Sequence, residues 1–169
     1  MDNKPREKQL FVEAWEIAEV EVDVPTLCPL INRVANEQNI PNFALEAQPA
    51  NSKTTNTFVW FDVFIINRTT ADKTPIGVLT LESLGSNRTI LRVPPRSQWL
   101  KGDLTPRELT IMAYIEKDKD VIKLYDGHFI QFLKSLDIVL KKYGLKVTFH
   151  KRFLRGLKEA AEIYKVVKP

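Results

Sequence analysis

The sequence has few of the residues that build disulfides, metal centres and nucleophile–base pairs. Its 169 residues include one cysteine, Cys28, and two histidines, His128 and His150. A single cysteine cannot form an intramolecular disulfide, which favours a reducing, cytoplasmic compartment or simple indifference to oxidation. Cys28 suits the role of a small buried apolar side chain. Because the cysteine and the two histidines fall in three separate predicted elements, we expect no metal site and no cofactor.

Glycine-rich motifs and long hydrophobic runs are also missing. The six glycines are dispersed, so none forms a phosphate-binding loop, and no G-x-S-x-G, H-E-x-x-H or C-x-x-C motif occurs. The longest apolar run, residues 58–66, is interrupted by Asp62. It is far shorter than the roughly 18 residues that a membrane span needs. We therefore expect no membrane span, and the sequence leaves catalysis undecided while leaning toward a protein that is not an enzyme.

What the sequence does contain is an antiparallel meander between Thr57 and Pro94. Residues 57–66 are apolar on both faces, which predicts a central strand that is covered on both sides. Returning strands are predicted at residues 76–81 and 89–93, because stretches of turn-forming residues separate them. The rest of the chain is expected to cover or extend this meander.

Three shorter elements are predicted before the meander. Strict alternation over residues 19–24 predicts a half-buried strand with its valines facing inward. Apolar residues at helical spacing over residues 27–39 predict a short helix with Thr26 as its N-cap. Residues 43–47 are a candidate for a further short strand.

Residues 105–116 carry two conflicting signals. Thr105 and Glu108 form a capping box around a proline in the first turn, which favours a helix. The alternation of apolar residues from Leu109 onward, followed by a charged turn, favours a strand instead. We slightly favour the strand, with residues 121–125 as the returning strand.

Two helices are predicted in the last third of the chain. The apolar spacing over residues 128–143 predicts an amphipathic helix that stops at Gly144. Residues 150–166 predict a second, basic helix. The chain is therefore divided into a single α+β domain over residues 1–144 and a basic helical arm over residues 145–169.

The predicted fold class is α+β, with an antiparallel sheet of five to seven strands, a short N-terminal helix and amphipathic C-terminal helices. A second architecture is kept beside it. The strand, the Asn-Arg-Thr loop and the next strand over residues 58–81 resemble the early strands of immunoglobulin-like sandwiches, and residues 104–110 would supply another strand. This resemblance implies a β-sandwich with a helical C-terminal arm, although the Cys…Trp…Cys pattern of that family is absent.

Asp62 is the only charged residue in the predicted central strand. Its simplest interpretation is a strand kink or an ion pair with an arginine, because an unpaired buried charge is costly. With Glu82 on the neighbouring strand it would form an acidic pair for Mg²⁺, as in a nuclease. However, Leu84 stands where a restriction-type nuclease has a lysine. We therefore predict no catalytic residue.

A basic strip is predicted along the last strand of the meander. Arg88 and Arg92 are four residues apart, so they point the same way from a strand, and Arg96 follows them. Trp99 and Lys101 come next, and basic groups beside an aromatic ring are how single-stranded nucleic acids are held. The alternative is a solvated sheet edge whose charges prevent aggregation.

The C-terminal arm is the most basic part of the chain. From Lys141 to the end, nine Lys or Arg residues stand against two Glu, a net charge of +7, whereas the remainder has a net charge of −3. Such a segment binds nucleic acid or an acidic membrane surface, or it docks on an acidic patch of a partner or of the chain itself; we favour docking. The arm residues predicted to bind are Lys151, Arg152, Arg155 and Lys158, and the acidic patch is Glu13, Glu16, Glu19, Glu21 and Asp23.

The sequence supports three functions, in descending order. The first is a non-enzymatic intracellular binding or adaptor domain that has a protein partner or associates with itself. The second is a nucleic-acid-binding protein that uses the arginine strip and the basic arm. The third is a small-molecule-binding protein or an unrecognised hydrolase, because a long helix over a meander can enclose a cavity lined by aromatic side chains. Those side chains are Trp15, Phe58, Trp60, Phe61, Phe64, Phe129 and Phe132.

Overall fold

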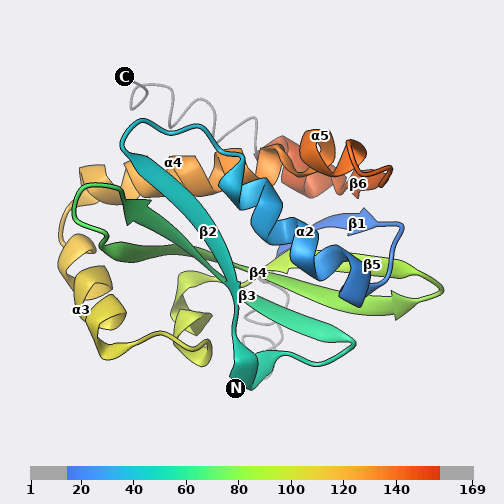
Figure 1. Cartoon of the computed structure of the whole chain (residues 1–169), viewed down its shortest axis with the longest axis horizontal. Coiled ribbons are helices and arrows are strands. Elements are labelled where there is room, and N and C mark those ends of the chain that lie inside the picture. Colours follow the sequence, from blue (N-terminus) through green and yellow to red (C-terminus); the bar gives the residue numbers. More distant parts are fainter. Residues whose placement is uncertain (1–14, 157–169) are drawn as a thin grey trace, which may run out of the picture.

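One antiparallel sheet of six strands organises the fold, in the order β2-β3-β4-β5-β1-β6 (Figure 1). The computed structural model describes residues 15–156, apart from a few side chains between residues 96 and 101. The sheet confirms the predicted α+β class, and because it is single in the described part of the chain, the immunoglobulin-like alternative is wrong. The strands are β1 Trp15–Val20, β2 Phe43–Pro49, β3 Phe58–Asn67, β4 Lys73–Gly85, β5 Arg88–Val93 and β6 Val147–Phe149.

The predicted meander is confirmed as β3, β4 and β5, with β2 added at one edge. β1 pairs with β5 on the other side, so the N-terminal strand closes the meander from a distance in sequence. β1 begins and ends earlier than the alternation of residues 19–24 predicts, because the chain turns after Val20, where the N–H of Val22 donates to the Val20 carbonyl. The register between β1 and β5 shifts between Glu16 and Ala18, at a bulge.

Helix α2 (Val24–Asn36) carries the chain across one face of the sheet, from β1 to the far edge strand β2 (Figure 1). Its N-cap is Asp23, whose Oδ1 accepts a hydrogen bond of 2.9 Å from the N–H of Thr26. The prediction of Thr26 as N-cap is therefore wrong by one turn, because Asp23 satisfies the first-turn N–H groups instead. The apolar side of α2 is buried, as the helical spacing predicts.

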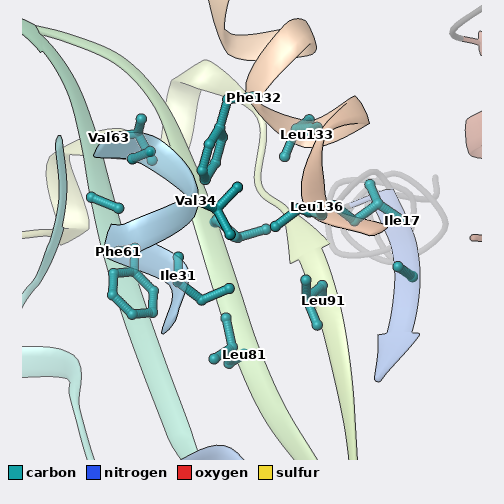
Figure 2. Close-up of a cluster of buried hydrophobic side chains, with 14 of the residues drawn as sticks. Ile17, Ile31, Val34, Phe61, Val63, Leu81, Leu91, Phe132, Leu133 and Leu136 are labelled. Carbon is teal, nitrogen blue, oxygen red and sulfur yellow. The ribbon is translucent and has the colours of Figure 1, made fainter. Parts of the chain in front are cut away.

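The main core lies between this face of the sheet and helices α2, α4 (Lys119–Lys134) and α5 (Leu136–Lys141). Figure 2 shows side chains from the sheet meeting side chains from the helices in one continuous cluster. Burial of each such side chain contributes about 1.5–3 kcal/mol to the stability of the fold. The labelled residues are Ile17, Phe61, Val63, Leu81 and Leu91 from the sheet, and Ile31, Val34, Phe132, Leu133 and Leu136 from the helices.

A smaller cluster covers part of the opposite face of the sheet. Trp60 and Val78 of the sheet pack there with Ala50 and Trp99, all of them buried. Trp99 comes from the short helix η2 (Arg96–Lys101), and a second short helix, η1 (Asn51–Lys53), follows β2. Helix α3 (Pro106–Ile115) adds Met112 to the edge of this cluster.

The predicted strand over residues 105–116 is wrong, because these residues form α3. Both halves of the capping box are present: the Thr105 hydroxyl accepts from the N–H of Glu108 at 3.2 Å, and Glu108 Oε1 accepts from the N–H of Thr105 at 3.0 Å. The returning strand over residues 121–125 is also wrong. Asp118 accepts from the first N–H groups of α4, so the charged turn starts a helix there.

The amphipathic helix predicted over residues 128–143 is divided into α4 and α5 at Ser135. The Ser135 hydroxyl donates to the Phe132 carbonyl, and Gln38 of the α2 end donates to the same hydroxyl oxygen. Gly144 has a φ of 77°, which agrees with its predicted role in stopping the helix. The segment after it contains β6, which pairs with β1.

Candidate functional site

Arg88 and Arg92 lie on the same face of the sheet, where each guanidinium binds carboxylates from neighbouring strands. Arg92 Nη2 lies 3.4 Å from Glu16 Oε2 of β1, and Arg92 Nη1 donates to Glu82 of β4. Arg88 pairs with Glu19 of β1. We call these five residues the sheet ladder. Two cations meet three carboxylates in it, so the ladder does not present net positive charge to a polyanion.

The other members of the predicted basic strip are placed differently. Trp99 is only 6% exposed and packs in the cluster with Trp60 and Val78, so its ring faces the protein interior. Arg96 and Lys101 lie at the two ends of η2, and their side chains are outside what the structure describes. The structure therefore brings Arg88 and Arg92 together but places Trp99 in a core. Binding of nucleic acid at these residues stays a prediction.

The described helical part of the C-terminal arm, residues 151–156, follows β6 and is anchored to it. Phe153 is 4% exposed, and its ring centroid lies 5.4 Å from that of Phe149 in β6. The N–H of His150 donates to the Ile17 carbonyl of β1 at 2.9 Å, which fixes the point where the strand becomes helix. An anchored first turn holds its outer side chains in a defined orientation.

Those outer side chains are basic and exposed. Lys151, Arg152 and Arg155 flank the buried Phe153 in sequence, and within residues 15–156 none of the three forms an ion pair. We call these three residues the arm-start surface. Lys158 lies outside the described residues. Beside this surface lies Trp15, which is 58% exposed and whose ring would be 3.7 Å from a Cβ added to Gly156.

Most carboxylates of the predicted acidic patch bind groups that lie outside the arm. Glu16 and Glu19 belong to the sheet ladder, and Asp23 caps α2. Within the described residues, the side chains of this patch meet the arm at one place, where Glu19 Oε2 lies 3.7 Å from His150 Nε2. Glu21 is exposed, and Glu13 lies outside the described residues. In the described part of the chain, the arm-start surface therefore has no carboxylate partner.

Asp62 is buried at 4% exposure on the same face of the sheet as the ladder. Its Oδ1 accepts from Trp60 Nε1 at 3.0 Å, and its Oδ2 accepts from the N–H of Asp103 at 3.2 Å. Burial raises the pKa of this carboxyl, and the two hydrogen bonds offset that effect in part. Gly102 lies directly against it, because a Cβ there would be 2.4 Å from Asp62 Oδ1.

This geometry corrects two of the interpretations of Asp62, the ion pair with an arginine and the acidic pair with Glu82. The partners of Asp62 are an indole and a backbone N–H, so the predicted ion pair with an arginine is wrong. Asp62 lies opposite Val78, whereas Glu82 lies opposite Phe58, so the register separates the proposed acidic pair. Asp62 instead fastens the η2–α3 connection to the sheet. Sequence reasoning missed Gly102 and Asp103, since only the fold brings them to β3.

The cavities differ from the predicted aromatic one. A groove of about 500 Å³ lies between the first half of α2, strands β2 and β3, and the loop around Thr55. Of the predicted aromatic lining only Phe61 contributes to it, because Phe129 and Phe132 pack in the main core. Cys28 lines the groove, and burial raises the pKa of its thiol, which keeps it protonated.

Within residues 15–156, no three His, Cys, Asp or Glu side chains are grouped so that they could hold a metal ion. None of the helices in the same range is at once long enough and apolar enough to span a membrane. Comparison with models of protein families, with curated proteins and with solved structures finds no match to this chain.

Proposed function

We propose that the chain is a non-enzymatic binding or adaptor domain that engages an acidic segment of a protein partner through the arm-start surface. The observation that carries this proposal is the exposure of Lys151, Arg152 and Arg155 without any carboxylate partner in residues 15–156. An exposed cation without a counter-charge can pair with a new carboxylate without the loss of an existing ion pair. A partner carboxylate therefore meets less competition here than at the sheet ladder.

The anchoring of the arm supports a specific rather than a diffuse charge contact. Phe153 is buried and Phe149 packs against it, so the helical turn that carries the cations is held in place before a partner arrives. A preorganised surface loses less conformational entropy on binding. The neighbouring Trp15 is exposed, and tryptophan and arginine are the side chains that most often dominate the binding energy of protein interfaces.

The environment favours a protein over a nucleic acid as partner. A nucleic acid needs a basic track for successive phosphates and aromatic rings for its bases. The sheet ladder offers three carboxylates for two arginines, and Trp99 is buried in its own cluster. A short acidic peptide needs only the arm-start surface. We also propose a reducing, cytoplasmic location, which the single cysteine supports.

The experiment that tests this function is fluorescence anisotropy with a labelled glutamate-rich peptide and with labelled single-stranded DNA, at about 50 and about 200 mM salt. We expect the wild type to bind the acidic peptide, and K151A/R152A/R155A to bind it at least about tenfold more weakly. The matched control K117A/K123A/K134A removes the same charge from exposed positions elsewhere. Equal losses in both variants, or no loss in the first, would refute the assignment of the surface.

Single-stranded DNA decides between the first two functions. Tighter binding to DNA than to the peptide, lost in the arm-start variant and steeply weakened by salt, would replace the protein partner with a nucleic acid.

A further inference from the structure

β6 is the edge strand of the sheet next to the arm-start surface. Its pairing with β1 is flanked by two hydrogen bonds, from the N–H of Glu21 to the Lys146 carbonyl and from the N–H of His150 to the Ile17 carbonyl. In an antiparallel pair such bonds recur at every second residue, so Thr148 exchanges both of its bonds with Glu19. The N–H and C=O groups of Val147 and Phe149 therefore point away from β1, toward the free edge.

The two edge strands of the sheet differ in whether described residues bind their outward backbone groups. At β2, Asn32 Oδ1 accepts from the N–H of Ala47 at 3.0 Å, and Arg68 Nε donates to the Phe43 carbonyl at 3.1 Å. Pro49 ends that strand without an N–H group. At β6, no hydrogen bond from any of residues 15–156 reaches the outward groups of Val147 and Phe149. The free edge of β6 is thus a place where another strand can pair.

Positive charge stands at both ends of this edge. Lys146 precedes β6 and Lys151 and Arg152 follow it, all three exposed and without an ion pair in the described residues. Glu19, on the adjacent strand, is neutralised by Arg88 and faced by His150. An incoming strand therefore meets, between cations, backbone groups that no residue of the range 15–156 pairs with. Two copies of this edge would repel each other for the same reason, which argues against self-pairing through β6.

We propose that β6 accepts an extended acidic segment of a protein partner as a seventh strand, with its carboxylates beside Lys146, Lys151 and Arg152. This rests on the proposed function and specifies how the partner is held. Addition of a strand to a sheet edge supplies affinity through backbone hydrogen bonds, and the charges supply selectivity. A nucleic acid cannot form that ladder, so this mode of binding belongs to a polypeptide.

The test uses synthetic peptides of alternating Glu and Thr that differ only in backbone N-methylation. One peptide is unmodified, one is N-methylated at odd positions and one at even positions; binding is measured by anisotropy at about 50 mM salt. N-methylation removes the donors along one edge of an extended peptide. We expect one of the two methylated peptides to bind at least about tenfold more weakly than the unmodified peptide, and the other to bind within about twofold of it.

Val147→Pro provides a second test from the protein side. Proline at this position removes an outward N–H but leaves the bonds between Thr148 and Glu19, and proline is tolerated on edge strands. We expect weaker binding of the unmodified peptide, with circular dichroism and thermal unfolding as checks that the fold is kept.

The outcomes separate this inference from the function on which it rests. Equal binding of all three peptides, with binding lost in K151A/R152A/R155A, would overturn strand pairing and leave the arm-start surface as the binding site. Unchanged peptide binding in that triple variant would overturn the proposed function itself. Binding of single-stranded DNA in place of every peptide would overturn both.

Discussion

The sheet ladder and the arm-start surface both carry basic side chains, but those of the ladder pair with carboxylates and those of the arm start do not, within the described residues. Arg88 and Arg92 point the same way, as strand spacing predicts, and both are bound by carboxylates from β1 and β4. Lys151, Arg152 and Arg155 flank an anchored phenylalanine in sequence, and no carboxylate of residues 15–156 pairs with them. The difference teaches that a basic cluster becomes a candidate binding surface only when its counter-charges are absent from the folded neighbourhood.

The largest effect is expected from removing the anchor of the arm-start surface. Phe153→Ala leaves a cavity between the arm and β6 and should lower the free energy of unfolding by about 3–5 kcal/mol. Binding of the acidic peptide should weaken as well, because the cations lose their fixed orientation. Urea denaturation and anisotropy measure the two effects. Leu154→Ala, at a neighbouring side chain that is 47% exposed, is the control and should change the stability little.

Asp62 sharpens the comparison, because this buried carboxylate on the ladder side of the sheet is bound by two N–H groups and by no cation. Asp62→Asn keeps one acceptor oxygen for two N–H donors, from Trp60 and Asp103, so we expect a loss of about 1–3 kcal/mol at neutral pH. Urea unfolding measures this loss. Little or no loss at neutral pH would show that the carboxylate does not fasten the η2–α3 connection.

The same variant gives a prediction for pH dependence. Burial raises the pKa of Asp62 above its unfolded value of 3.8, so the folded protein binds this proton more tightly than the unfolded chain. The contribution of Asp62 to stability is therefore greatest at low pH and falls as pH rises from 3.8 through the raised pKa. The stability advantage of the wild type over Asp62→Asn should shrink over that window. An advantage that grows with pH would mean that the pKa is lowered.

A smaller effect, on the affinity for DNA, is expected when the arginines of the sheet ladder lose their carboxylate partners and so resemble the cations of the arm start. E16Q/E19Q/E82Q removes the three carboxylates that occupy Arg88 and Arg92. We expect the affinity for single-stranded DNA at about 50 mM salt to rise about tenfold, because freed cations can then neutralise phosphates. E37Q/E46Q frees two dispersed lysines and serves as the control. If the two variants gain in proportion to the three and the two carboxylates that they remove, net charge alone decides binding and the comparison fails.

The sequence predicted correctly several elements whose signals lie within a short stretch of the chain. The meander, the strand at β2 and the stop at Gly144 follow from alternation, turn residues and glycine, and the structure contains all three. The strand predicted over residues 105–116 failed because a short alternation of apolar residues was weighed above the capping box of Thr105 and Glu108. The capping bonds are present in the structure, so the local polar signal was the better guide.

The parts that sequence could not provide are contacts between distant segments. No pattern near Trp99 indicates that it packs on Trp60, or that Gly102 lies against the Asp62 carboxylate. The partners of Arg92 come from β1 and β4, which are 76 and 10 residues away in sequence. The exposed cations of the arm start were among the predicted binding residues, but their lack of counter-charges depends on the same distant packing.

The measurement that tests the central claim most directly compares two charge-removing variants in one binding experiment. The affinity for the labelled acidic peptide is measured for K151A/R152A/R155A and for R88A/R92A at about 50 mM salt. Because the arm-start cations lack carboxylate partners in the described residues, we expect the first variant to lose at least about tenfold in peptide affinity. Because Arg88 and Arg92 are already paired with carboxylates, we expect the affinity of the second variant to stay within about twofold of the wild type. A loss in R88A/R92A with unchanged binding in the arm-start variant would contradict the claim.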